Sequence, residues 1–167
     1  LKGFFDLYCT QGPSSTGRFE ELARQHRYFK VVETGWPKLD NFFRHGPVAL
    51  PQNKRPTILY CSTFTRWITS APHLFDTIEQ LITRREWDWL LTLHPKSDPA
   101  IVARYSALAE RYPNVRFANN DDNMALLRQA DAMVCDSSSI IVEFMMLDKP
   151  VVTFRNTAPG PHLIDID

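Results

Sequence analysis

The chain has 167 residues, 44% of them hydrophobic and 23% charged, and its 19 basic and 19 acidic side chains give a net charge of zero. This length suits one domain with a piece of another, and the composition is that of an ordinary globular protein. A neutral chain without a sustained basic run gives no electrostatic reason to expect nucleic acid as a partner. No apolar run reaches the roughly 18 residues that cross a bilayer, and no signal peptide is visible.

Three cysteines, Cys9, Cys61 and Cys135, are odd in number and widely spaced. Their spacing matches neither a disulfide framework nor a zinc site, so we expect buried, reduced thiols and a cytosolic compartment. The chain also begins at Leu1 in mid-pattern, without a methionine. We interpret it as a piece of a longer protein.

Residues 1–45 are expected to belong to, or to bridge from, a preceding domain. Their pattern predicts, in order, a strand at 4–8, a turn at 10–14, a helix at 18–27, a strand at 29–32 and a short helix that starts at Pro37 with Leu39, Phe42 and Phe43 on its apolar side. Residues 46–56 hold three prolines and a glycine and are interpreted as a linker.

Residues 57–167 alternate regularly between strand and helix patterns. The strands are expected at 57–61, 89–93, 115–118, 132–135 and 151–154, and the helices at 72–85, 99–111, 123–129 and 140–147. Such alternation predicts an α/β fold with a doubly wound, Rossmann-like parallel sheet in the usual strand order 3-2-1-4-5. In that order a crevice opens at the carboxyl ends of the first and fourth strands.

Polar residues gather where these apolar strands end. Ser62 and Thr63 follow the first strand, His94 and Lys96 follow the second, and Asp136, Ser137, Ser138 and Ser139 follow the fourth. Because the carboxyl ends of parallel strands share one edge of the sheet, we expect these groups to bind a polar ligand there. Hydroxyls and backbone N–H groups at the positive end of a helix suit a phosphate.

The run at 140–147 is apolar on most faces, so we expect it to be buried at the centre of the fold. Glu143 interrupts this run and is interpreted as an acceptor for a ligand hydroxyl, with a buried structural pair as the alternative. The serines could instead cap the helix, and His94 could be structural. Asp121 and Asp122 suggest either a metal or a helix cap, and we predict no metal site.

The sequence contains no Gly-rich phosphate loop and no serine-hydrolase elbow. Oxidoreductase, kinase and serine-hydrolase functions therefore lose their main support. Arg66 and Arg155 lie near strand ends and are weaker candidates for a phosphate contact.

Five motifs occur in a familiar order: Thr34 to Asp40, Ser62 to Thr65, Leu93 to Lys96, Asp136 to Ser139 with Glu143, and Lys149 to Val151. Together they resemble the CDP-glycerol glycerophosphotransferases of teichoic acid and capsule biosynthesis. Those enzymes have two Rossmann-type domains in the GT-B architecture. The resemblance covers the chain from about Thr10 to Phe154.

The resemblance implies that residues 57–167 form a carboxyl-terminal domain, incomplete at its end, that holds CDP-glycerol in an interdomain cleft. His94, as the catalytic residue, and Ser137, Ser138 and Ser139 would contact the donor phosphates, and Glu143 would bind the ribose. An acceptor hydroxyl would attack the donor phosphoryl group in line. Helix-end N–H groups and His94 would stabilise the departing phosphate without a metal or another cofactor.

The resemblance also implies parts that lie outside this sequence. In the family the general base belongs to a Trp-His-Gly-type motif of the amino-terminal domain, upstream of Leu1, so the fragment alone is expected to be inactive. The implied partners are a nucleotide-activated donor, a polymer or lipid-linked acceptor, and that missing domain. The implied location is the cytoplasm, peripheral at the inner face of the membrane.

Two further functions stay open on the sequence alone. A UDP-sugar-dependent GT-B glycosyltransferase, or an enzyme like UDP-N-acetylglucosamine 2-epimerase, would use the same crevice for UDP. A non-catalytic α/β binding module would use the fold without the chemistry.

Overall fold

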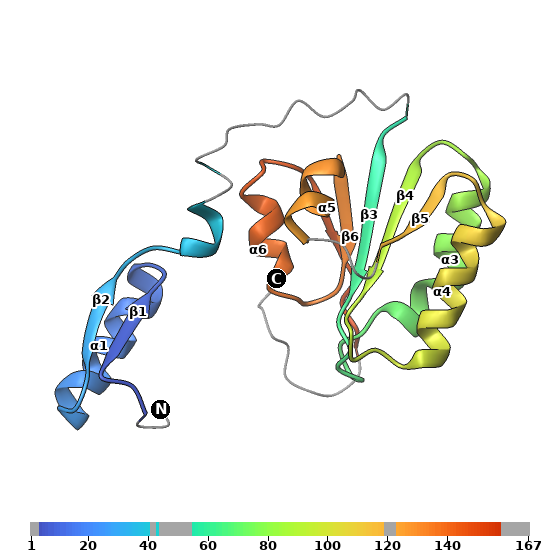
Figure 1. The fold of residues 1–167 in the computed structure, drawn as a ribbon. Coiled ribbons are helices and arrows are strands. Elements are labelled where there is room, and N and C mark those ends of the chain that lie inside the picture. Colours follow the sequence, from blue (N-terminus) through green and yellow to red (C-terminus); the bar gives the residue numbers. More distant parts are fainter. Residues whose placement is uncertain (1–3, 41–42, 44–54, 119–122, 158–167) are drawn as a thin grey trace. The chain divides into compact units, whose positions relative to one another are not determined.

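The computed structural model describes residues 4–40, 43, 55–118 and 123–157 (Figure 1). The chain divides into two compact units, Leu1–Val48 and Ala49–Asp167. The linker expected at 46–56 lies outside the described residues except for Arg55 and Pro56.

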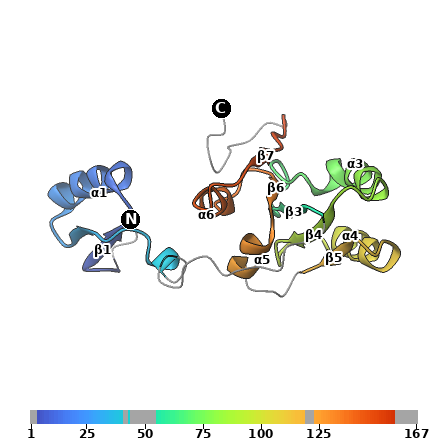
Figure 2. The ribbon, with the colours of Figure 1, turned by 90° about the horizontal axis from the view of Figure 1, so that it is seen from above.

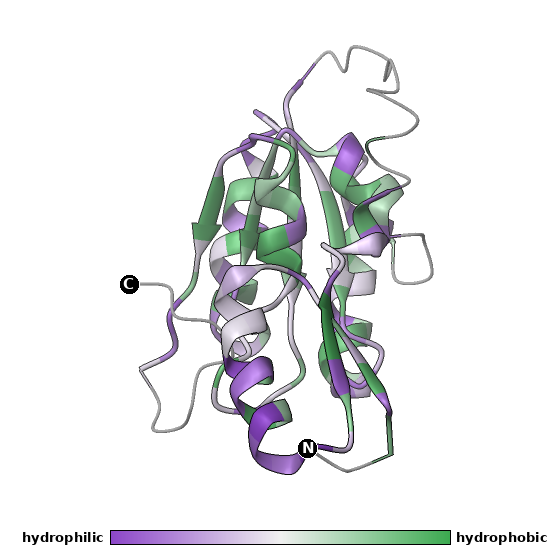
Figure 3. Cartoon of the chain, turned by 90° about the vertical axis from the view of Figure 1, so that its left-hand side faces the viewer, coloured by the Kyte–Doolittle hydropathy of each residue, from purple (hydrophilic) through white to green (hydrophobic). Residues whose placement is uncertain are grey.

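The first unit is a strand–helix–strand motif. It consists of strand β1 (Leu7–Thr10), helix α1 (Pro13–His26), strand β2 (Lys30–Glu33), which pairs parallel to β1, and the 3-10 turn η1 (Pro37–Leu39). The turn predicted at 10–14 is wrong in part, because α1 already begins at Pro13, whose fixed φ suits the first turn of a helix. No residue of α1 is buried, and Figure 3 colours much of this helix purple, as hydrophilic. Phe42, expected on the apolar side of the short helix, lies outside the described residues.

The second unit is a five-stranded parallel sheet in the order β5-β4-β3-β6-β7. Its elements are β3 (Thr57–Ser62), α3 (Ala71–Thr83), β4 (Asp88–Leu93), α4 (Pro99–Arg111), β5 (Val115–Phe117), α5 (Asn123–Gln129), β6 (Ala132–Cys135), α6 (Ile140–Met145) and β7 (Val151–Thr153). Strands β3 to β7 are the first to fifth strands of this unit, so the observed order is the expected 3-2-1-4-5. The prediction of a doubly wound α/β sheet is confirmed.

Helices cover both faces of this sheet, with α3 and α4 on one face and α5 and α6 on the other (Figure 2). Successive side chains of a strand alternate between the two apolar clusters beneath them. Leu59 and Cys61 of β3 join the cluster under α5 and α6, whereas Tyr60 joins the cluster under α3 and α4. The sheet is therefore the centre of a three-layer sandwich.

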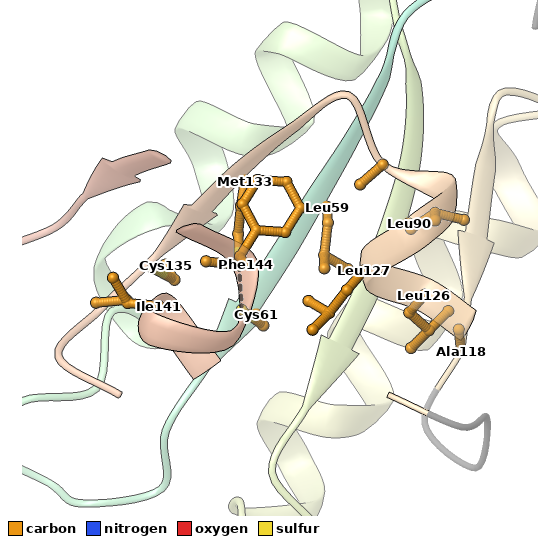
Figure 4. Packing of buried hydrophobic residues seen from close by; sticks show 11 residues of the cluster. Leu59, Cys61, Leu90, Ala118, Leu126, Leu127, Met133, Cys135, Ile141 and Phe144 are labelled. Carbon is orange, nitrogen blue, oxygen red and sulfur yellow. Dashed lines mark hydrogen bonds between the residues drawn. The ribbon is translucent and has the colours of Figure 1, made fainter. Parts of the chain in front are cut away.

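Figure 4 shows the first of these clusters, in which Phe144 of α6 and Leu127 of α5 pack on the sheet. The Cys61 thiol donates to Met133 Sδ at 3.6 Å. A hydrogen bond with Cys135 and burial together raise the pKa of Cys61, which keeps it a neutral thiol. Cys61 and Cys135 are buried and free, as predicted, but the prediction of burial is wrong for Cys9, which is exposed.

Helix α6 differs from its expected environment. The run was predicted to be buried on most faces, yet Val142, Met145 and Met146 are 42%, 62% and 45% exposed. The acid among them is the buried residue, because Glu143 is only 4% exposed. The helix thus turns its carboxylate inward and part of its apolar surface outward.

Candidate functional site

The carboxyl ends of β3, β4 and β6 lie side by side, with Ser62 in register with Leu93 and Cys61 with Cys135. The residues that follow these ends contact one another. His94 N–H donates to the Ser62 carbonyl at 3.1 Å, and the Ser62 hydroxyl donates to Asp136. Three of the predicted site regions therefore meet at one edge of the sheet.

Asp136 is fully buried, and its carboxylate is the centre of this meeting point. It accepts the backbone N–H groups of Thr63 and Ser70 at 2.9 and 2.8 Å, the Ser70 hydroxyl at 2.9 Å, and the Ser62 hydroxyl. A carboxylate only accepts, so each hydroxyl must direct its single hydrogen at Asp136. The buried acid is satisfied entirely by protein donors.

The direction of these bonds orders the neighbouring hydroxyls as well. Ser70 uses its hydrogen on Asp136, so Tyr60, 2.8 Å away, must donate to Ser70. Ser62 does the same, so Thr69, at 2.9 Å, donates to Ser62. The result is a directed network. Ser62 and Ser70 donate to Asp136, and Thr69 and Tyr60 donate to these two serines.

This network also occupies the amino terminus of α3. Ser70 is the N-cap residue and its N–H bonds to Asp136, while Ala71 N–H donates to the Ser62 hydroxyl at 3.2 Å. The positive end of α3 thus already holds an anion supplied by the protein itself. Direct phosphate contacts, predicted for Asp136 and Ser62, do not fit this geometry.

Two buried tyrosines complete the network. Tyr105 of α4 donates to the Ala71 carbonyl at 2.9 Å and stacks on Tyr60, with ring centroids 5.4 Å apart. Burial raises the pKa of Tyr105 to about 12 and raises that of Tyr60 further. Both phenols therefore remain hydrogen-bond donors at neutral pH.

His94 lies half-buried at the end of β4, and its ring contacts Phe64 at a centroid distance of 4.3 Å. Its Nδ1 accepts the Lys96 backbone N–H at 3.0 Å. In the neutral imidazole the proton is then on Nε2, which makes that nitrogen a donor. A strand-end histidine held in this tautomer can donate to an anion.

A cleft of about 720 Å³ opens between the loop after β3 and the loop after β4. The described residues around it include Thr63, Phe64, Arg66, Lys96 and Asp98. Lys96 Nζ lies 5.5 Å from the centre of the Phe64 ring. This volume is typical of small-ligand sites, and the cleft has two cationic side chains.

The positive end of α4 contributes little to this cleft, because Asp98 caps it and accepts the Ala100 N–H at 2.8 Å. Arg66 and Lys96 are therefore the groups that would attract an anion. From the sequence, Arg66 is only a weak candidate for a phosphate contact, and Phe64 is not predicted as a site residue. The signal for Phe64 was an aromatic residue among hydroxyls at a strand end.

The serine turn after β6 is only partly accessible. Ser137 is buried, Ser138 is half-buried and Ser139 is exposed. Ser139 is the N-cap residue of α6, but within this fully described helix its side chain makes no capping bond. The described residues that line the cleft come from the loops after β3 and β4 and from the first turns of α3 and α4. They include neither these serines nor Glu143 nor His94.

Among the described residues, no group of three or more His, Cys, Asp and Glu side chains is placed to hold a metal ion. Asp121 and Asp122, considered above as metal ligands or caps, lie outside the described residues. In the part of the chain that the structure describes, no helix is both long and apolar enough to cross a bilayer.

The fold is that of GT-B glycosyltransferases. The chain is similar to S. aureus MnaA in a structure with UDP, with a TM-score of 0.62 and 15% identity over 92% of this chain and 43% of that one. It is also similar to E. coli heptosyltransferase WaaC with ADP-2-deoxy-2-fluoro heptose, with a TM-score of 0.53 and 19% identity over 91% of this chain and 48% of that one.

Residues 4–157 match the family described as CDP-glycerol:poly(glycerophosphate) glycerophosphotransferase. The chain belongs to this family. A curated relative, the teichoic acid glycerol-phosphate primase of Bacillus subtilis (strain 168), is 27% identical over 131 residues, which cover 75% of this chain and 33% of the primase. The chain thus spans about a third of the length of that relative.

Proposed function

We propose that this chain carries the donor-binding part of a glycerophosphotransferase, which transfers glycerol phosphate from CDP-glycerol to a teichoic acid or capsule-type polymer. The observation that carries the proposal is a cationic cleft at the carboxyl edge of a GT-B sheet, in a chain of the glycerophosphotransferase family. The carboxyl edge is where open parallel sheets bind ligands.

The chemistry of the cleft fits a diphosphate. Arg66 offers a planar fork of N–H donors and Lys96 offers a mobile ammonium group. His94 does not line the cleft, but its ring contacts Phe64, which does, and its Nε2 is proposed as a further donor. Phe64 is 43% exposed, contacts the His94 ring and lies 5.5 Å from Lys96 Nζ, and it would present an apolar surface to the rest of a nucleotide. Together these groups match the charge and the mixed polarity of CDP-glycerol.

In the proposed reaction an acceptor hydroxyl attacks the glycerol-linked phosphorus, and the bond from that phosphorus to the CMP oxygen breaks. Negative charge then grows on the departing phosphate. His94, Arg66 and Lys96 would stabilise that charge more strongly in the transition state than in bound donor. The base that takes the acceptor proton is proposed to lie in a preceding domain, and metal independence stays a prediction.

The roles of the predicted residues divide in this proposal. Thr63 and Lys96 keep their predicted donor contacts because both line the cleft. Ser138 and Ser139 are accessible and remain candidates for phosphate. Glu143 is only 4% exposed and does not line the cleft, so its contact with ribose stays a prediction. Asp136 and Ser62 are buried, and we propose that they stabilise the site without contacting the donor.

We also propose that residues 1–45 are part of a larger domain. Parallel sheets are normally covered on both faces, yet within the first unit Leu7 of β1 and Val32 of β2 are 51% and 48% exposed. A role at the inner face of the membrane, with a polymer or lipid-linked acceptor, completes the proposal.

The test is a titration of the protein with CDP-glycerol, CMP, UDP and UDP-N-acetylglucosamine by calorimetry. We expect CDP-glycerol to bind tightest and Arg66→Ala to weaken it about tenfold or more, since charge-assisted bonds are lost. Arg84→Ala, at the far end of α3, is the matched control and should leave binding unchanged. Tighter binding of uridine nucleotides would favour a UDP-dependent enzyme, and no nucleotide binding would favour a non-catalytic module.

A further inference from the structure

The loop between β3 and α3 supplies Thr63, Phe64 and Arg66 to the cleft. Both ends of this loop are tied to one side chain, because the N–H groups of Thr63 and Ser70 donate to Asp136. Asp136 itself follows β6 and is 66 residues from Ser70 along the chain. One buried carboxylate therefore joins the serine turn to a wall of the cleft.

We propose that Asp136 is a positioning residue of the donor site: it sets the place of loop 63–70, and so of Phe64 and Arg66, without touching the ligand. The inference rests on the function proposed for the cleft. It assigns Asp136 a task that its complete burial permits, whereas direct ligand contact would require the loop to open.

The network links the other wall of the cleft to the same acid. Pro99 and Ile101 of α4 line the cleft, and Tyr105 of the same helix donates to the Ala71 carbonyl. Ala71 follows Ser70, which bonds to Asp136 through both its N–H and its hydroxyl. The loop and α4 are thereby held in a fixed relation.

This task requires a carboxylate. Asp136 Oδ2 accepts the Ser62 hydroxyl, the Ser70 hydroxyl and the Ser70 N–H, and the Thr63 N–H is shared between Oδ1 at 2.9 Å and Oδ2 at 3.2 Å. An asparagine has one accepting oxygen and an NH₂ group that donates. In Asp136→Asn the NH₂ group would face the Ser62 and Ser70 donors if it took the place of Oδ2, or the Thr63 N–H if it took the place of Oδ1.

The chain offers a matched control at the other end of β6. Asp131 is exposed and accepts one backbone N–H, that of Thr57 at the start of β3, at 2.7 Å. Asp131→Asn makes the same substitution at the residue that precedes β6, but its amide oxygen can still accept that bond. The pair of variants separates loss of a charge from loss of the converging bonds.

The experiment measures amide hydrogen exchange and CDP-glycerol binding in the full chain. In Asp136→Asn we expect the Thr63 and Ser70 amides to exchange about tenfold faster or more, and binding to weaken by a similar factor, because bonds to a charged acceptor are lost. The Leu91 amide in β4 should be accelerated less than the two loop amides, because only a loss of global stability would reach it. Asp131→Asn should stay within about twofold of wild type in both measurements.

Unchanged exchange and binding in Asp136→Asn would overturn the inference. So would an equal acceleration across the whole sheet, because Asp136 would then support global stability and not the loop. A wild-type protein that binds no nucleotide would refute the proposed function, and the exchange pattern alone would then decide whether Asp136 orders the loop.

If Asp136→Asn does not fold, the Ser70→Ala variant tests the positioning role of Asp136. This variant keeps the Ser70 N–H bond to Asp136, loses one hydroxyl donor to that carboxylate and also removes the acceptor of the Tyr60 hydroxyl. We expect a smaller acceleration confined to loop 63–70, with weaker CDP-glycerol binding. No acceleration in the loop would refute the positioning role.

Discussion

Two aspartates flank strand β6, and each reaches across to strand β3. Asp131, at the amino edge of the sheet, is exposed and accepts one N–H from Thr57. Asp136, at the carboxyl edge, is fully buried and accepts the hydroxyl of Ser62, the last residue of β3, together with two N–H groups and one hydroxyl from the loop that follows. The same residue type on the same pair of strands thus performs two different tasks.

The two edges of the sheet therefore differ in how their polar groups are held. At the amino edge, polar contacts such as Arg55 with Asp88 are partly exposed and local, so water can replace either partner. At the carboxyl edge the polar groups are buried and depend on one another, because a buried donor without a partner is unfavourable. The carboxyl edge is therefore expected to be sensitive to single substitutions.

The largest expected effect separates the two aspartates directly. Asp136→Ala leaves buried N–H groups and hydroxyls without an acceptor and should lower the free energy of unfolding by about 3 to 5 kcal/mol. Asp131→Ala removes one exposed acceptor and should lower it by about 1 kcal/mol. Urea unfolding of both variants measures the difference. Equal losses would show that the two edges are alike.

A second prediction concerns Tyr105, whose hydroxyl bonds the Ala71 carbonyl inside the network. Tyr105→Phe should lower the free energy of unfolding by about 1 to 2 kcal/mol, because a buried carbonyl loses its donor. Tyr112→Phe is the control, since that side chain is only half-buried and its hydroxyl donates to Glu79. We expect a smaller effect there.

The raised pKa of Tyr105 adds a pH dependence to this comparison. The phenol has an ordinary pKa of 10.0 when unfolded and a pKa of about 12 when folded, so the folded state holds a proton that the unfolded state releases between these values. The contribution of Tyr105 to the free energy of unfolding should therefore be fully present below pH 10.0 and should decrease as the pH rises to about 12. In Tyr105→Phe the free energy of unfolding should decrease less steeply over this pH range, because unfolding then releases up to one proton fewer. An identical slope in both proteins would refute the assignment.

Sequence patterns predicted the second unit well, because its strands and helices are long enough to show their period. The bounds of α4, Pro99–Arg111, and of β6, Ala132–Cys135, agree with the prediction, and the strand order follows from the alternation. The first unit was harder to predict. Its helix α1 buries no residue, so its apolar period gave a weak signal for where it begins.

The sequence predicted where the candidate site lies, but it predicted only some of the roles of the residues there. The expectation that polar residues meet at one edge held, since Ser62 contacts both His94 and Asp136. The burial of Asp136 could not be predicted, because its partner Ser62 is 74 residues away. Likewise, nothing in the spacing of α6 indicated that Glu143 faces inward while Met145 faces outward.

The smallest expected effect tests the amino edge itself. Arg55 and Asp88 form an ion pair at 2.6 Å, with side chains 42% and 35% exposed. Because solvent screens such a pair, Arg55→Ala should lower the free energy of unfolding by less than about 1 kcal/mol. The loss should shrink further in 1 M salt, where the screening length is about 3 Å. Urea unfolding at low and high salt measures it. A large, salt-independent loss would show that the amino edge is also a mutually dependent network, and the contrast between Asp131 and Asp136 would then reflect only those two positions.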